Sequence, residues 1–268
     1  MAIRRSKCAV ITLALALGSS GIQRTNAFVY EQIRTSTHAQ FFRECHSSSH
    51  CCSSMSSKSS GAHAGPIILG SKSFTRKAIL EKMAFTPIIR TADIDEAAIG
   101  DRTSDPRELV LELGLAKAKA LLPVLKAEAE RGTLGAVYLL TADQVVVHEG
   151  RILEKPADEE EVRRNIAGYA ISPCRTVGSA VLTNVLTGEQ VSGVDTAEVS
   201  FAEIPETVVA QLCREGTVFR CAGGLMVEHE MVQPFILKID GTIDSVMGLS
   251  KSLVLKLLDQ LSPRTAPT

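Results

Sequence analysis

Residues 67–77 limit most strongly what this chain can fold into. The stretch reads Ile-Ile-Leu, then Gly-Ser-Lys-Ser, and apolar residues then recur at Phe74, Ala78, Ile79 and Met83. An apolar run before a glycine-containing loop predicts a buried strand, and the spacing after the loop is typical of a helix. The chain should therefore contain a strand that leads through a tight loop into a helix N-terminus, as α/β proteins do.

The start of this helix is a candidate anion site. A helix N-terminus has unpaired N–H groups and a partial positive charge, so it favours phosphate. Ser71 and Ser73 add hydroxyl donors, and Arg76 and Lys77 add full positive charges one turn later. The spacing is not that of a Walker A loop. The alternative is an ordinary strand–helix turn with solvated basic residues.

Composition argues mildly against a nucleic-acid reader. Aromatic residues make up 4% of the 268 residues, and Trp is absent, whereas such proteins use basic patches and stacking aromatics. The formal net charge of −1 combines about +5 in residues 1–65 with about −6 in the remainder. The 45% hydrophobic content is enough for one large domain or two small ones. An acidic body suits a protein that binds phosphates at a local basic site with a divalent cation.

Residues 1–65 have the composition of a targeting leader. Basic residues precede an apolar run at 8–17 that is too short to span a bilayer, and small residues lead to Phe28, so residues 1–27 look like a signal peptide. Residues 28–65 are Ser-rich and acid-poor, like a transit peptide. Together they resemble the bipartite plastid leaders of algae with secondary plastids. The alternatives are a secretory signal with a linker, or a cytoplasmic protein that starts at Met55.

The cysteines favour a reduced compartment. Four of the seven lie in the leader without a C-x-x-C pair, which argues against a zinc site there. The other three are Cys174, Cys213 and Cys221, an odd number that does not suggest a disulfide framework. No transmembrane helix is predicted.

Carboxylates and one lysine form a second group of candidates. Residues 93–96, Asp-Ile-Asp-Glu, follow a strand expected at 85–91 and are either a solvated turn or oxygen ligands for Mg²⁺. In the helix expected over 107–122, Lys117 lies within the apolar stripe and Lys119 points away. A lysine on the buried side needs a partner unless it snorkels to the surface, so Lys117 is a candidate anion ligand.

A strand expected at 136–140 is followed by Asp143 and Gln144. Ligands usually sit at the carboxyl ends of strands in open α/β sheets, so Asp143 is a candidate metal ligand or general base, with a capping role as the alternative. Residues 145–148 continue extended, and Glu149-Gly150 predicts a turn. The resulting hairpin would bring Lys155 close to Asp143.

The rest of the chain completes an α/β pattern. Helices are expected over 158–169, 205–215 and 250–261, and a long hairpin over 174–201. Residues 221–224, Cys-Ala-Gly-Gly, are expected to be a close-approach backbone segment before Glu228.

Seven short motifs follow one another along residues 66–261. They are Ser71-x-Ser73-x-Thr75-Arg76, Asp93-Ile94-Asp95-Glu96, Ala116-Lys117-Ala118, Thr141-Ala142-Asp143, Lys155-Pro156, Ala222-Gly223 and Val246-Met247-Gly248-Leu249. In this order and spacing they resemble the Maf family of nucleoside triphosphate pyrophosphatases. The resemblance implies an elongated mixed-sheet α/β fold of the Maf/ITPase type, with a deep central cleft, over 66–261 and a tail at 262–268. It also implies a homodimer and a divalent metal cation, Mg or Mn.

The same resemblance implies roles for the candidates. Ser71, Ser73 and Arg76 would hold phosphates, with Lys77 adding charge.

Glu96 and Asp143 would serve the metal and the attacking water, with Asp143 as the proton acceptor. Lys117 and Lys155 would neutralise the triphosphate, because attack on an α-phosphorus needs charge stabilisation and a positioned base.

Three positions bear on the substrate: Thr75, Gln144 and Glu228. The family branch that prefers dTTP and UTP has Arg, Thr and Gln there, and the branch that prefers 7-methyl-GTP has Trp, Gln and Glu. This chain matches the second branch at Gln144 and Glu228, and it matches neither branch at Thr75. A carboxylate at Glu228 also suits a positively charged methylated guanine.

Two other functions are weighed. A nucleotide-binding regulator with little catalysis is the alternative, because Maf proteins are also linked to division arrest and Thr75 departs from the family pattern. A nucleic-acid-binding module comes third, because the body is acidic; steep salt dependence of DNA affinity would favour it. We expect neither nucleic acid nor a membrane as a partner.

Overall fold

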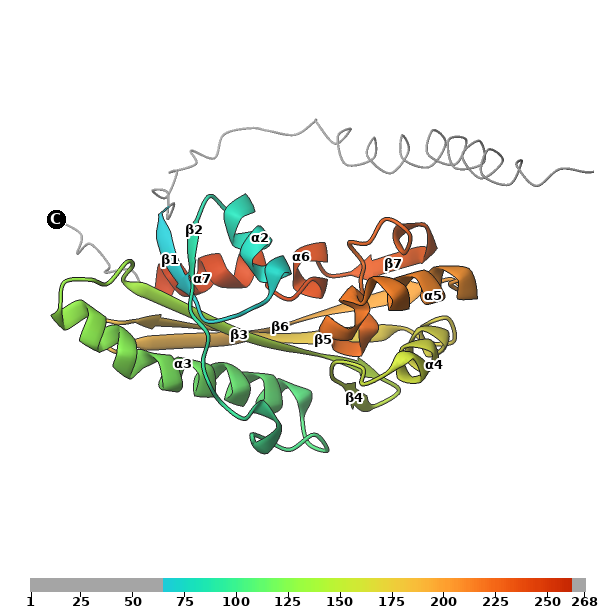
Figure 1. Cartoon of the computed structure of the whole chain (residues 1–268), viewed down its shortest axis with the longest axis horizontal. Helices are drawn as coiled ribbons and strands as arrows, with labels where there is room; N and C mark the ends of the chain where they lie inside the picture. Colours follow the sequence, from blue (N-terminus) through green and yellow to red (C-terminus); the bar gives the residue numbers. More distant parts are fainter. Residues whose placement is uncertain (1–64, 262–268) are drawn as a thin grey trace, which may run out of the picture. The chain divides into compact units, whose positions relative to one another are not determined.

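A seven-stranded mixed sheet forms the centre of the fold (Figure 1). The computed structural model describes residues 65–261, so the predicted signal, nearly all of the leader and the tail lie outside the described residues. The sheet order is β2-β1-β3-β5-β6-β7, and β4 also pairs with β3. The strands are β1 Pro66–Leu69, β2 Thr86–Ile89, β3 Tyr138–His148, β4 Arg151–Leu153, β5 Cys174–Asn184, β6 Gln190–Phe201 and β7 Ile236–Asp240.

Helices cover both faces of this sheet. α3 lies along one face, and α2, α6 and α7 lie on the other (Figure 1). The α-helices are α2 Phe74–Lys82, α3 Pro106–Glu130, α4 Glu159–Tyr169, α5 Glu206–Glu215, α6 Ile243–Val246 and α7 Lys251–Leu261. The 3₁₀ turns are η1 Glu96–Ala98, η2 Thr217–Arg220, η3 Ala222–Gly224 and η4 Gln233–Phe235. None of the helices in residues 65–261 is long and apolar enough to cross a membrane.

Strand β1 shows why both faces are covered. Its side chains alternate between the two faces, as in any strand. Ile67 and Leu69 pack in the cluster formed by α2 and α7, whereas Ile68 packs in the cluster under α3. All three are at most 1% exposed, so a continuous apolar run is needed here.

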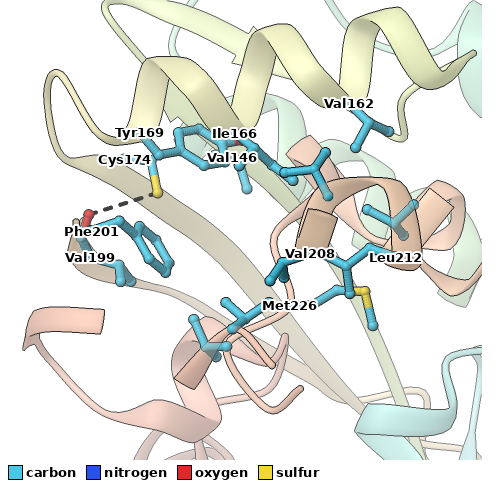
Figure 2. Close-up of a cluster of buried hydrophobic side chains, with 14 of the residues drawn as sticks. Val146, Val162, Ile166, Tyr169, Cys174, Val199, Phe201, Val208, Leu212 and Met226 are labelled. Carbon is cyan, nitrogen blue, oxygen red and sulfur yellow. Dashed lines mark hydrogen bonds between the residues drawn. The ribbon is translucent and has the colours of Figure 1, made fainter. Parts of the chain in front are cut away.

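A third apolar cluster joins α4, α5 and the far end of the sheet (Figure 2). Tyr169 belongs to this cluster and is 2% exposed, and its hydroxyl donates to the Gly223 carbonyl at 2.7 Å. A Cβ at Gly223 would lie 2.3 Å from that hydroxyl oxygen, and the residue has φ +61°. The predicted close approach of backbone at residues 221–224 is therefore confirmed.

Most predicted elements are confirmed. Asp158 caps α4 by accepting from the Glu161 N–H, β5 and β6 form the long antiparallel hairpin, and Gly216 ends α5 in the left-handed conformation. The described cysteines, Cys174, Cys213 and Cys221, are free.

Three expectations were wrong. α3 does not end at Leu122; it continues through Pro123, because Leu125 on the next turn packs in the core. Phe74, which was counted in the apolar spacing that predicted α2, is 71% exposed. The strand expected at 136–140 extends to His148, because β5 pairs with it along residues 138–147.

Candidate active site

The site is built at an open stretch of the β3 edge. β5 pairs along one edge of β3, so β1 and β4 share the other edge. On that edge, β1 pairs with β3 only as far as Leu140, and the pairing of β4 with β3 begins at Val146. Within residues 65–261 no strand pairs with the interval 141–145 on this edge. Asp143 and Gln144 lie in that interval, so Asp143 follows the end of the parallel pairing although it is in the middle of its own strand.

The predicted loop and helix start flank this open edge. The Ser73 hydroxyl caps α2 by accepting from the Arg76 N–H at 3.4 Å and also pairs with the Thr75 hydroxyl at 2.8 Å. The Ser71 hydroxyl accepts from the Ser73 N–H at 3.1 Å. Both serines therefore shape the helix start, which is the capping chemistry expected of an N-terminus.

Arg76 is the cation that this loop brings to β3. It is 9% exposed; its Nε donates to the Gly248 carbonyl at 2.9 Å, and its Nη1 donates to the Ala142 carbonyl at 2.9 Å. Burial lowers its pKa, and the charges of Asp143 and Glu96 act in the opposite direction. In the part of the chain that the structure describes, Nη2 of Arg76 makes no hydrogen bond, so this group can still bind an anion.

Lys117 joins the two carboxylates predicted to bind metal. Its Nζ lies 2.6 Å from Asp143 Oδ1 and 3.1 Å from Glu96 Oε1. The lysine is 7% exposed, so the prediction that it faces inward and needs a partner is confirmed, and snorkelling is excluded. Of the predicted carboxylate run, only Glu96 contacts Lys117; Asp95 instead caps η1.

The position of Lys117 depends on how closely α3 approaches the sheet. A Cβ at Gly114 would lie 2.9 Å from Ser179 Oγ, so only glycine allows this approach. The Thr141 hydroxyl donates to the Gly114 carbonyl at 2.7 Å, and the Ser179 hydroxyl donates to the Val110 carbonyl at 2.6 Å. Lys117 is about one turn after Gly114, so these contacts place its side chain beside Asp143.

Gln144 lies on the opposite face from Asp143, because successive strand residues alternate. Its Nε2 donates to the carbonyls of Ser245 at 2.9 Å and Val246 at 3.1 Å. The same segment supplies the Gly248 carbonyl that binds Arg76. With its amide hydrogens used, Gln144 presents its Oε1 as an acceptor.

Glu228 and Lys155 lie on two further segments, after η3 and after β4. Burial raises the pKa of the Glu228 carboxyl. Cys221 lies within the electrostatic reach of both Glu228 and Lys155, and burial raises the pKa of its thiol to about 11. Glu228 and Lys155 therefore belong to one neighbourhood around Cys221.

The predicted residues are not all brought together. Lys77 is half-exposed and pairs with Glu81 at 3.7 Å along the outside of α2, so the structure does not direct it to the open edge. Lys155 is exposed, and no contact joins it to Asp143 in residues 65–261. Thr75 reaches only the Ser73 hydroxyl among the described hydrogen bonds.

A divalent cation fits the chemistry of the two carboxylates. No group of three His, Cys, Asp or Glu side chains within residues 65–261 could hold a metal. Glu96 and Asp143 are two oxygen donors that already share one cation, the Lys117 ammonium. Mg²⁺ is commonly held by one or two carboxylates together with phosphates and water, so these residues suit it.

Sequence reasoning missed several residues that build the site. Gly114 and Ser179 set the position of α3, and only a packed model of helix on sheet reveals them. Arg102, which no sequence motif singled out, donates to the Glu96 carbonyl at 2.7 Å.

A family model and several named proteins match this chain. The model of the family described as "Maf-like protein" matches residues 66–261. The 7-methyl-GTP pyrophosphatase of Dictyostelium discoideum is 38% identical over 197 residues, which cover 74% of this chain and 98% of the relative.

Other relatives have related names. The nucleoside triphosphate pyrophosphatase of Chlamydia muridarum is 32% identical, over 73% of this chain and 91% of its own length. The dTTP/UTP pyrophosphatase of Bdellovibrio bacteriovorus is 26% identical, over 72% of this chain and 97% of its own length.

Proposed function

Since the chain belongs to the Maf-like protein family and is a nucleoside triphosphate pyrophosphatase, we propose that it hydrolyses 7-methyl-GTP and related modified nucleotides to the monophosphate and pyrophosphate. The observation that carries the proposal is the Glu96–Lys117–Asp143 cluster beside buried Arg76, at the open edge of β3. This arrangement offers both a base and fixed positive charge within one site.

Asp143 is the proposed proton acceptor. Its Oδ1 is held by Lys117, whereas its Oδ2 makes no hydrogen bond among the described residues and can accept from a water. The water oxygen forms a bond to the α-phosphorus, the bond from that phosphorus to the α,β-bridging oxygen breaks, and Asp143 takes the water proton. Pyrophosphate leaves with the bridging oxygen, and the nucleoside monophosphate remains.

Arg76 and Lys117 are the proposed charge-stabilising groups. Arg76 has Nη2 available for a phosphate oxygen, and its Nε and Nη1 are fixed by two backbone carbonyls and the Ser71 hydroxyl, so the guanidinium is preorganised. Glu96 and Asp143 would hold a divalent cation, which would supply further positive charge to the phosphates when bound. Ser71, Ser73 and the exposed Lys155 complete the proposed phosphate site.

Gln144 and Glu228 are the proposed base-selecting residues. The Gln144 Oε1 can accept from a base N–H group, and the Glu228 carboxylate would attract the positive charge of a 7-methylated guanine. The 38% identity to a protein named 7-methyl-GTP pyrophosphatase supports the same preference. Thr75 cannot provide an aromatic or guanidinium group at the third position.

Pyrophosphate release by the full chain with Mg²⁺ tests the proposal. Rates are measured with 7-methyl-GTP, GTP, dTTP, UTP and CTP, each with and without chelator. We expect the highest kcat/KM for 7-methyl-GTP. Higher values for dTTP and UTP would overturn the substrate preference and keep the enzyme. Tight nucleotide binding without release would favour the nucleotide-binding regulator instead.

Two variants assign the roles. Asp143→Asn should abolish release while nucleotide binding remains measurable by calorimetry; unchanged turnover would overturn the role of Asp143. Glu228→Gln should lower the kcat/KM ratio of 7-methyl-GTP to GTP, and Glu230→Gln, a change at a neighbouring exposed carboxylate, should leave that ratio unchanged.

The divalent metal, the homodimer and the plastid leader stay predictions from resemblance. Loss of release on chelation tests the metal, sedimentation of the purified chain tests the dimer, and a fluorescent fusion carrying residues 1–65 tests the leader. The same fusion distinguishes a plastid from a secretory or cytoplasmic location.

A further inference from the structure

Arg102 connects two segments that carry site residues. On one side its guanidinium binds the backbone next to Glu96: Nη2 donates to the Glu96 carbonyl at 2.7 Å, and Nη1 donates to the carbonyls of Gly100 at 3.2 Å and Ile99. These bonds hold the backbone of residues 96–100 against the Arg102 side chain.

On its other side, Arg102 pairs with Glu154 through two parallel contacts. Nε lies 3.3 Å from Oε2 and Nη2 lies 3.4 Å from Oε1. The Glu154 carbonyl accepts from the Gly223 N–H at 2.8 Å, and Lys155 is the next residue in the chain. The guanidinium therefore links the Glu96 loop to the segment that precedes Lys155, and the backbone of that segment also binds the Gly223 turn.

The Glu96 loop needs such a contact. Between Ile89 and Pro106, η1 is the only regular element that the structure describes. The Glu96 side chain is 46% exposed, so packing does little to hold its carboxylate near Lys117. A surface ion pair usually contributes little to stability, but a bidentate arginine with further carbonyl contacts can fix geometry, and a lysine cannot reproduce that fork.

We propose that Arg102 is a positioning residue, which sets the Glu96 carboxylate and the Lys155 ammonium at a fixed separation across the substrate phosphates. Arg102 itself does not contact the substrate. The proposal rests on the function proposed above. It predicts that loss of the guanidinium affects turnover more than folding, because misplacement of a catalytic group by about 1 Å can reduce the rate by about a hundredfold.

Arg102→Met tests this in the full chain, with Arg163→Met as the matched control. Arg163 also bridges two carboxylates, Glu159 at 2.9 Å and Glu206 at 2.8 Å, away from the site. We expect Arg102→Met to lower kcat for 7-methyl-GTP by about tenfold or more. Its Tm should equal that of Arg163→Met. Arg102→Lys should not restore the rate. A kcat within about twofold of wild type would overturn the proposal.

Coupling and exchange measurements separate this inference from the proposed function. The losses of kcat caused by Arg102→Met and Glu154→Gln should be strongly non-additive in the double variant. The effects of Arg163→Met and Glu154→Gln on kcat should be additive. Amide hydrogen exchange in residues 95–104 should rise in Arg102→Met and not in the control, whatever nucleotide the protein uses. Unchanged exchange there overturns the positioning role; absence of pyrophosphate release by wild type, with raised exchange in Arg102→Met, overturns the proposed function alone.

Discussion

The Lys117 Nζ lies 2.6 Å from Asp143 Oδ1 and 3.1 Å from Glu96 Oε1, so one ammonium pairs with two carboxylates that come from different parts of the chain. The ammonium occupies the position between the oxygens that we propose as metal ligands. A divalent cation would compete with it for the same two charges.

Lys117→Met should therefore bind Mn²⁺ more tightly than wild type in the absence of nucleotide, while pyrophosphate release falls. The two carboxylates lose the ammonium that pairs with both of them, so a bound Mn²⁺ would take over the stabilisation of their negative charge. Mn²⁺ affinity is measured by electron paramagnetic resonance of the free ion. Lys119→Met, on the exposed side of the same helix, is the control. Weaker Mn²⁺ binding by Lys117→Met would show that Lys117 does not compete with the metal.

Arg76→Lys should destabilise the protein by about 1–3 kcal/mol, because the carbonyls of Gly248 and Ala142 each lose a buried donor. Turnover should also fall, since an ammonium cannot bind two carbonyls and a phosphate in one plane. Urea unfolding and pyrophosphate release measure the two effects. Lys77→Met, on the exposed side of α2, should change stability by no more than about 0.5 kcal/mol and leave turnover close to wild type. A large loss of turnover in Lys77→Met would contradict the geometry.

The parts of the site that were predictable depend on local pattern. Ser73 precedes a helix, and capping needs only the next few residues. Lys117 lies within an apolar stripe, and the high cost of an unpaired buried charge predicts a partner without saying which one.

The rest depends on contacts between distant residues. The Arg76–Gly248 bond spans 172 residues, and the Arg102–Glu154 pair spans 52. The open edge around Asp143 exists because β1 pairs with β3 only up to Leu140, and β4 pairs with β3 only from Val146 onward. Apolar periodicity predicts strands and helices, but it does not predict where neighbouring strands stop pairing.

Gly114→Ala should destabilise the protein by about 1–3 kcal/mol and reduce turnover. The added methyl would lie 2.9 Å from Ser179 Oγ and 3.1 Å from Val181 Cγ2, so α3 must move outward and carry Lys117 away from Asp143. Leu115→Ala, at the neighbouring exposed position, controls for substitution in the helix. Crystallography of the variant would measure the Lys117–Asp143 distance. A turnover equal to wild type would mean that the helix position is not critical for Lys117.

Glu228→Gln should stabilise the protein relative to wild type at pH 8 and not at pH 4. Burial raises the pKa of the Glu228 carboxyl in the folded protein, so the folded state holds this proton more tightly than the unfolded state. The resulting stability is fully present below the unfolded pKa and is lost as the pH rises through the folded pKa. Glutamine removes this titration, so the variant should avoid the loss that wild type shows on the alkaline side.

Thermal unfolding from pH 4 to pH 8 measures the Tm difference between Glu228→Gln and wild type. Glu230→Gln, which changes an exposed carboxylate two residues away, should show no comparable dependence on pH. A Tm difference that is constant across the range would mean that Glu228 titrates alike in the folded and unfolded states. A difference that grows with pH would show that the folded protein carries the charge of Glu228 at a cost, as expected of a carboxylate held ready for a positively charged base.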